Sequence, residues 1–136
     1  MNKNNLVELP NKGKLLIITD LHGNLKDYKT YLSIMGNMNG IDHILFTGDF
    51  IHGMDEENYD SITILESLRD NCRNIKNFHV LLGNHEWAHI VDGPVFKGNT
   101  NQKKDFEIVL KKRFDYNWNQ KLEDYKSFFK SLCGYH

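Results

Sequence analysis

Side chains that can bind metal ions or transfer protons follow three short apolar segments of this chain. The segments span residues 14–19, 41–47 and 78–82, and each runs directly into a glycine-containing turn. The side chains in question are Asp20 and His22, Asp49 and His52, and Asn84 and His85. Any one of these pairs alone is typical of ordinary turn chemistry. Their repetition at the same position after three segments indicates one shared site.

The residue types are those of a metal-assisted hydrolase. Asp20 and His22 lie two residues apart, so on an extended segment both side chains would face the same side and reach one ion. Asp49 could bridge two ions, and Asn84 offers a neutral oxygen to the second. Mixed oxygen and nitrogen ligation favours Mn, Fe, Zn or Ni, and two such ions can activate a bridging hydroxide for attack on a phosphoryl group. His85 is next to a ligand yet free to face a substrate, where it would protonate the departing oxygen.

The elements that must position these residues follow from hydrophobic spacing. The three apolar segments suit buried strands of a parallel or mixed sheet. Helical spacing marks residues 25–35 and 62–72 between them, then residues 106–114 and 118–132 after a loop at 91–100. This order predicts an α/β layered domain with a βαβαβ start and helices on both faces of the sheet. All three pairs of polar residues then lie at the carboxyl ends of strands, where functional residues gather in such sheets.

Three motifs carry a resemblance to a known family. DLHGN at 20–24, GDFIHG at 48–53 and GNHE at 83–86 resemble the opening motifs of calcineurin-like metallophosphoesterases. The first and third most resemble the serine/threonine phosphoprotein phosphatase branch, and the resemblance covers about residues 14–87. It implies a binuclear centre of divalent metal ions, manganese among the candidates. In that centre Asp20 and His22 would bind the first ion, Asp49 would bridge, Asn84 would bind the second, His85 would be the general acid and Glu86 would be supporting structure.

The chain departs from the phosphoprotein phosphatase pattern at two motifs. His52 stands where that branch has a second Asp, no Arg follows it, and Leu82 stands where an Arg precedes the third motif. Three interpretations of His52 stay open. It accepts a hydrogen bond from His85, it touches the substrate phosphate as a catalytic residue, or it is an ordinary exposed histidine. The departures leave a nucleotide or dinucleoside polyphosphate as the second expected substrate class, after phosphoproteins.

The later histidines that complete both metals in the family have no counterpart after Trp87. His89 lies one turn after His85, and His136 is the final residue. The sequence therefore predicts a single metallophosphoesterase domain over residues 1–136 that is incomplete at its C-terminus. Its expected function is hydrolysis of phosphomonoesters by attack of a metal-bound hydroxide. The alternative is a truncated, non-catalytic module that binds metal or a partner, and an uncovered sheet edge would invite self-association.

Bulk composition argues against several other classes of protein. Hydrophobic residues make up 40% of the chain and charged residues 26%, as in an ordinary soluble globular domain. The formal net charge of -1 gives no electrostatic reason to expect nucleic acid or an acidic membrane as partner. The longest apolar run, residues 15–18, is too short to span a bilayer. The two cysteines lie far apart without CxxC spacing, which is typical of a reduced, cytoplasmic protein.

Overall fold

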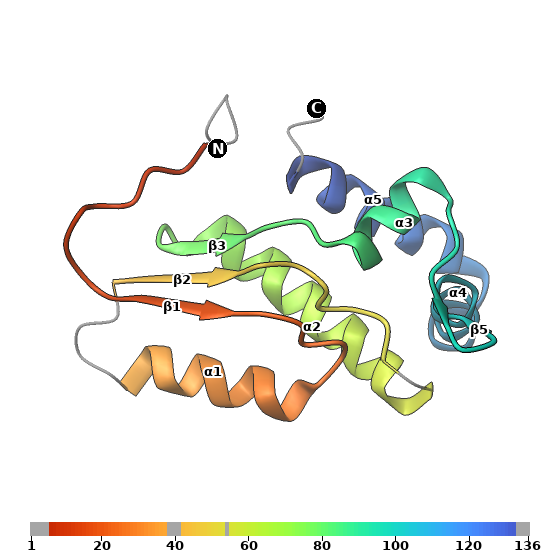
Figure 1. The fold of residues 1–136 in the computed structure, drawn as a ribbon. Helices are drawn as coiled ribbons and strands as arrows, with labels where there is room; N and C mark the ends of the chain where they lie inside the picture. Colours follow the sequence, from red (N-terminus) through yellow and green to blue (C-terminus); the bar gives the residue numbers. More distant parts are fainter. Residues whose placement is uncertain (1–5, 38–41, 54, 133–136) are drawn as a thin grey trace.

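The computed structural model describes residues 6–37, 42–53 and 55–132, and Figure 1 shows its elements. The strands are β1 (Leu15–Ile18), β2 (His43–Phe46), β3 (Phe78–Val80), β4 (Phe96–Lys97) and β5 (Thr100–Asn101). The helices are α1 (Leu25–Asn37), α2 (Asp55–Asn74), α3 (Asn84–Val91), α4 (Gln102–Phe114) and α5 (Trp118–Leu132), with a 3-10 turn at Asp115–Asn117 before α5. His136 lies outside the described residues.

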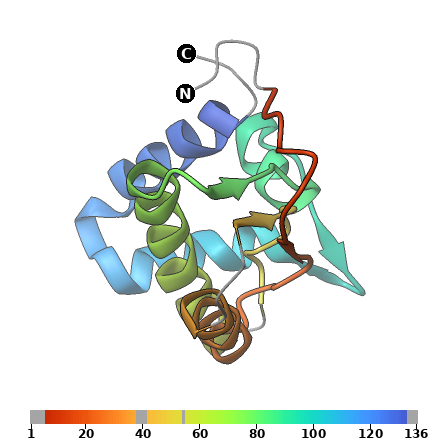
Figure 2. The same ribbon diagram turned by 90° about the vertical axis from the view of Figure 1, so that its left-hand side faces the viewer.

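The central sheet is parallel, with the strand order β1-β2-β3. Leu16 pairs with Ile44, which pairs in turn with Phe78. α1 and α2 connect consecutive strands, so the predicted βαβαβ start and α/β class are confirmed. Helices flank the sheet on both sides, with α2 on one side and α3 on the other in the view of Figure 2.

One face of the sheet builds the hydrophobic core, because successive side chains of a strand point to opposite faces. The buried strand residues are Ile18, Ile44, Phe46, Phe78 and Val80. On the opposite face Leu15, Ile17 and Leu81 remain 37%, 54% and 49% exposed. These side chains are an uncovered apolar surface of the kind expected to promote self-association, which stays a prediction.

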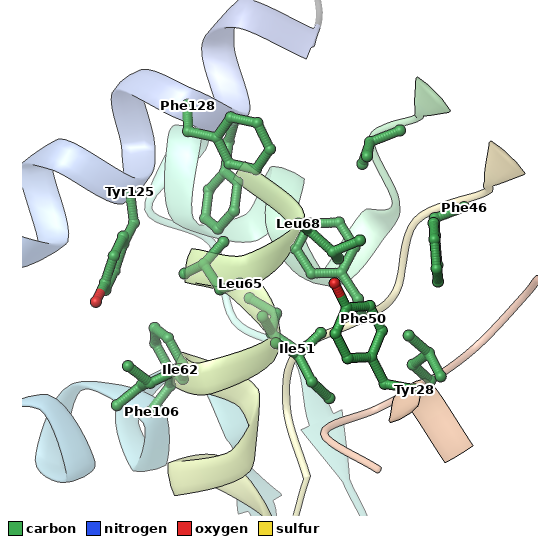
Figure 3. Packing of buried hydrophobic residues seen from close by; sticks show 14 of the residues in the cluster. Tyr28, Phe46, Phe50, Ile51, Ile62, Leu65, Leu68, Phe106, Tyr125 and Phe128 are labelled. Carbon is green, nitrogen blue, oxygen red and sulfur yellow. The ribbon is translucent and has the colours of Figure 1, made fainter. Parts of the chain in front are cut away.

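The loop after β2 is anchored in the same core. Phe50 and Ile51 are 1% and 0% exposed, and Figure 3 shows both among the side chains of α1 and α2, between Tyr28 and Leu65. Burying two large apolar residues of the second motif fixes the path of the backbone on either side of them. The neighbouring Asp49 and His52 are therefore held by the core rather than by a free loop.

α3, α4 and α5 gather beyond the carboxyl ends of the three parallel strands (Figure 1). The two late helical segments are confirmed as α4 and α5. The predicted loop at 91–100 contains a short antiparallel pairing of β4 with β5 at its end. The side chain of Asn101 then caps α4 by accepting the Lys103 N–H at 3.2 Å. Over the described part of the chain, no helix has the length and apolar character needed to cross a bilayer.

Candidate active site

The three motifs meet around Asp49. The N–H of His22 donates to the Asp49 carbonyl at 3.0 Å, and the N–H of Gly23 donates to the Phe50 carbonyl at 2.9 Å. From the third motif, the N–H of His85 donates to Oδ1 of Asp49 at 3.1 Å. Segments that follow three different strands are thus joined at one point by hydrogen bonds.

Four of the predicted site residues have a left-handed backbone. The φ angles are 50° at Asp20, 45° at His22, 53° at Asp49 and 69° at His52. The expectation that Asp20 and His22 lie on an extended segment is therefore wrong, since β1 ends at Ile18 and the chain turns at once. Left-handed non-glycine residues are uncommon, although Asp and His are enriched among them, and such strain concentrates at functional sites.

Two glycines let the second and third motifs approach each other closely. A Cβ on Gly48, which has φ of 99°, would collide with the backbone of Gly83, and a Cβ on Gly83 would collide with Asp49. Only residues without a side chain fit this crossing. The close approach brings Asn84, directly after Gly83, against the carboxylate of Asp49.

Glu86 holds the two motifs together from behind. Its carboxylate is fully buried and accepts the N–H groups of Asp49 at 2.7 Å, Gly83 at 3.0 Å and Phe50 at 3.2 Å. Burial raises its pKa to about 7, and these backbone donors oppose that rise. Glu86 contacts backbone only in these bonds, as a supporting residue would.

The oxygen donors of Asn84 and Asp49 suit a cation between them. The Asn84 amide lies 3.0 Å from each carboxylate oxygen of Asp49. With its nitrogen turned inward, the amide donates to both oxygens. With its oxygen turned inward, three oxygens converge, which is the donor set that a divalent ion needs.

His22 is oriented as a metal ligand. Its Nδ1 lies 3.3 Å from the Ile51 carbonyl, and that contact requires the proton on Nδ1. A histidine that donates one ring N–H to a backbone carbonyl keeps its other nitrogen bare for a metal, so Nε2 is free to bind an ion. Within the described ranges, no group of three or more His, Cys, Asp or Glu side chains is already arranged as a metal cluster. The predicted donors therefore fit a metal by type and orientation.

A row of three histidines lies behind these donors. The Nδ1 atoms of His52 and His85 are 2.9 Å apart, and the Nε2 atoms of His52 and His89 are 2.7 Å apart. His52 is 2% exposed, so its interpretation as an ordinary exposed histidine is wrong. Its hydrogen bond with His85 was one of the three roles left open. Sequence analysis gave His89 no role, although its spacing of four residues from His85 would place both on one helix face.

Burial keeps this row neutral. Burial and the neighbouring histidines lower the pKa of His52 to about 2. Burial and the Lys103 ammonium lower the pKa of His89 to about 3. The pKa of His85 is also lowered, by burial first and then by His22, while Asp49 and Asp20 oppose the shift. Asp20 thus lies within electrostatic reach of His85.

Comparison with known proteins agrees with this geometry. The family model described as calcineurin-like phosphoesterase matches residues 13–134. The catalytic subunit A1 of serine/threonine-protein phosphatase 2B from Saccharomyces cerevisiae is 32% identical over 104 residues, which are 76% of this chain. The match spans 18% of the length of that relative. No solved structure matches the chain. The chain belongs to the calcineurin-like phosphoesterase family.

Proposed function

We propose that this chain carries the first set of metal ligands of a metal-dependent phosphoesterase that hydrolyses phosphomonoesters. The observation that carries the proposal is the meeting of three motifs at Asp49, through the His22 and His85 backbone N–H groups. A phosphoesterase needs such a point, because the metal ligands and the proton donor must face the same substrate atom.

The ligands proposed for the divalent ions are Asp20, His22, Asp49 and Asn84. Mn, Fe, Zn and Ni all suit their mixture of oxygen and nitrogen donors. When bound, such ions activate water and neutralise charge on the phosphoryl group. The protein positions them by fixing Asp49 from behind through Glu86 and by fixing the His22 ring through Ile51.

His85 is the proposed general acid. It is half-buried, its backbone is tied to Asp49, and its ring contacts the His22 ring edge-on at 4.7 Å between centroids. A proton on its Nε2 would pass to the departing oxygen. His52 acts through the hydrogen bond with Nδ1 of His85, where the resemblance leads one to expect a carboxylate.

Phosphorylated serine or threonine in proteins is the proposed substrate class, supported by the name of the yeast relative. A nucleotide or dinucleoside polyphosphate is the second candidate. It is favoured by Leu82, which packs against the core where the phosphoprotein phosphatase pattern has an Arg, and by His52.

The proposed ligands serve one ion better than two. Asp20, His22 and Asp49 make an adequate first site, whereas Asn84 and a shared Asp49 make a weak second one. We therefore propose that residues 1–136 form one domain whose second site needs further donors.

Calorimetric titration of Mn²⁺ or Zn²⁺ into the chain tests the proposal. We expect tight binding to the wild-type chain, loss of that binding in Asp49→Asn, and unchanged binding in the control His79→Gln. His79 is on β3 and pairs with His43 rather than with the site. Equal metal affinity of the wild-type chain and the Asp49→Asn variant would contradict the proposed site.

A further inference from the structure

The row of three imidazoles needs one proton in each of its two contacts. Nδ1 of His85 faces Nδ1 of His52 at 2.9 Å, and Nε2 of His52 faces Nε2 of His89 at 2.7 Å. At such distances one nitrogen must donate and the other must accept. His52 and His89 are each 2% exposed, so bulk water does not replace either partner.

Counting protons leaves two arrangements for the neutral row. Each neutral imidazole carries one proton, so two of the three protons lie in the contacts and the third lies at an outer nitrogen. In one arrangement that outer nitrogen is Nε2 of His85, and Nδ1 of His85 is bare. In the other it is Nδ1 of His89, and Nδ1 of His85 is protonated and donates to His52.

The surroundings of His89 favour the second arrangement. No oxygen or nitrogen of the described residues bonds to its Nδ1. Its ring packs instead against Phe106 and Phe129, with centroid distances of 5.1 and 6.3 Å. An aromatic face is electrically negative, so it attracts an N–H and repels a bare lone pair. With Nδ1 protonated, Nε2 of His89 is an acceptor, and His52 must donate to it.

We propose that His89 is a positioning residue: its Nε2 accepts the Nε2–H of His52 and so leaves Nδ1 of His52 bare, ready to accept the Nδ1–H of His85. This inference rests on the proposed function, in which His85 is the general acid. An imidazole that donates a proton from Nε2 must also hold a proton on Nδ1, and that N–H needs an acceptor. A neutral His52 is such an acceptor in only one of its two tautomers. His89 selects that tautomer.

Long-range ¹H–¹⁵N NMR of the ¹⁵N-labelled chain, without added metal, tests the tautomers directly. We expect Nε2 of His52 to show the chemical shift of a protonated nitrogen and Nδ1 that of a bare one. His89 should show the opposite pattern, with Nδ1 protonated. A proton on Nδ1 of His52 would overturn the inference whatever the activity of the protein.

His89→Met and His89→Gln form a matched pair, because only Gln has an oxygen that can accept from His52. In His89→Met we expect His52 to move its proton to Nδ1. Turnover of a phosphomonoester with a poor leaving group should then fall roughly 10–100-fold, the usual effect of losing such an outer partner, with KM unchanged. His89→Gln should recover most of that turnover, and nitrophenyl phosphate, which needs little protonation, should be nearly unaffected.

Equal losses in the two variants, or equal losses for poor and good leaving groups, would show that His89 only fills space. His79→Gln is the control for removal of a histidine outside the row. A wild-type chain without any phosphatase activity would contradict the proposed function, and the nitrogen shifts of His52 would then decide the tautomers by themselves.

Discussion

Oε1 of Glu86 accepts the backbone N–H of Asp49 at 2.7 Å and the backbone N–H of Gly83 at 3.0 Å. A single carboxylate oxygen therefore joins the loop after β2 to the loop after β3. Oε2 of Glu86 accepts the N–H of Phe50 at 3.2 Å. The candidate metal ligands Asp49 and Asn84 are positioned by this carboxylate, which is not itself among the proposed ligands.

Replacing Glu86 should destabilise the whole domain. Glu86→Ala leaves several backbone N–H groups buried without an acceptor, and each such group costs about 1–3 kcal/mol. We expect the free energy of unfolding in urea to fall by about 3 kcal/mol or more. Glu86→Gln keeps one acceptor oxygen and should lose less. A loss in Glu86→Ala no larger than that of a surface substitution would contradict the anchoring role.

The crossing of Gly48 and Gly83 predicts a contrast between two glycine substitutions. In Gly83→Ala the new methyl group meets the backbone and carboxylate of Asp49. We expect a loss of stability of about 1–3 kcal/mol and weaker metal binding. Gly36→Ala, in α1 with open space around it, should be stabilising by roughly 0.5–1 kcal/mol. Thermal unfolding and metal titration of both variants give the measurement, and tolerance of Gly83→Ala would refute the close approach.

The buried histidines predict a loss of stability in mild acid. The folded pKa values of His52 and His89, about 2 and about 3, lie below the ordinary value of 6.5. The unfolded chain therefore binds more protons than the folded chain as the pH falls through 6.5, so stability is full above that pH and declines below it. Each histidine contributes a slope of up to about 1.4 kcal/mol per pH unit.

Urea unfolding at about pH 7 and about pH 5 measures this slope, and His89→Gln should remove about half of it. The charged and titratable groups that face His89 are His85, Asp92, Lys103 and Lys126. Lys103 stays protonated throughout this range, since its pKa is raised by Asp92 and Glu107. A stability that is constant between these two pH values would mean that the histidines are accessible to protons in the folded state.

Loss of His85 should separate catalysis from metal binding. His85→Asn should lower kcat for poor leaving groups by roughly 10²–10⁴-fold, the usual contribution of a general acid. Metal content should stay nearly unchanged, because His85 is not among the proposed ligands. The assay compares alkyl phosphates with nitrophenyl phosphate. Loss of metal, or the same loss for both kinds of substrate, would argue that His85 holds an ion instead.

The ligand count predicts unequal metal sites in the chain of residues 1–136. Asp20, His22 and Asp49 should give one tight site for Mn²⁺ or Zn²⁺, and His22→Gln should weaken it. The second site, with Asn84 and a shared Asp49, should remain largely empty at micromolar metal, so turnover should be slow. Calorimetry with a parallel phosphatase assay measures both. Two tight sites with ordinary turnover would contradict this count of ligands.

Local spacing in the sequence was enough to determine the parts of this protein that depend on near neighbours. Apolar runs closed by glycine and aspartate predict β1, β2 and β3, and helical spacing predicts the helices between and after them. Parallel strands end at the same edge of a sheet, so Asp49, His22 and His85 were expected to meet there. Their backbone hydrogen bonds agree with that expectation.

Tertiary structure alone decided what lies behind those residues. His52 bonds to His85 across 33 residues and to His89 across 37, and Glu86 reaches Asp49 across 37. No local pattern encodes which nitrogen atoms face each other over such separations, because the contact depends on how α3 packs against the loop after β2. The left-handed turn at Asp20 and His22 was missed for a related reason. An Asp-x-His sequence is compatible with both an extended strand and a turn, and the hydrogen bond from the His22 N–H to the Asp49 carbonyl selects the turn.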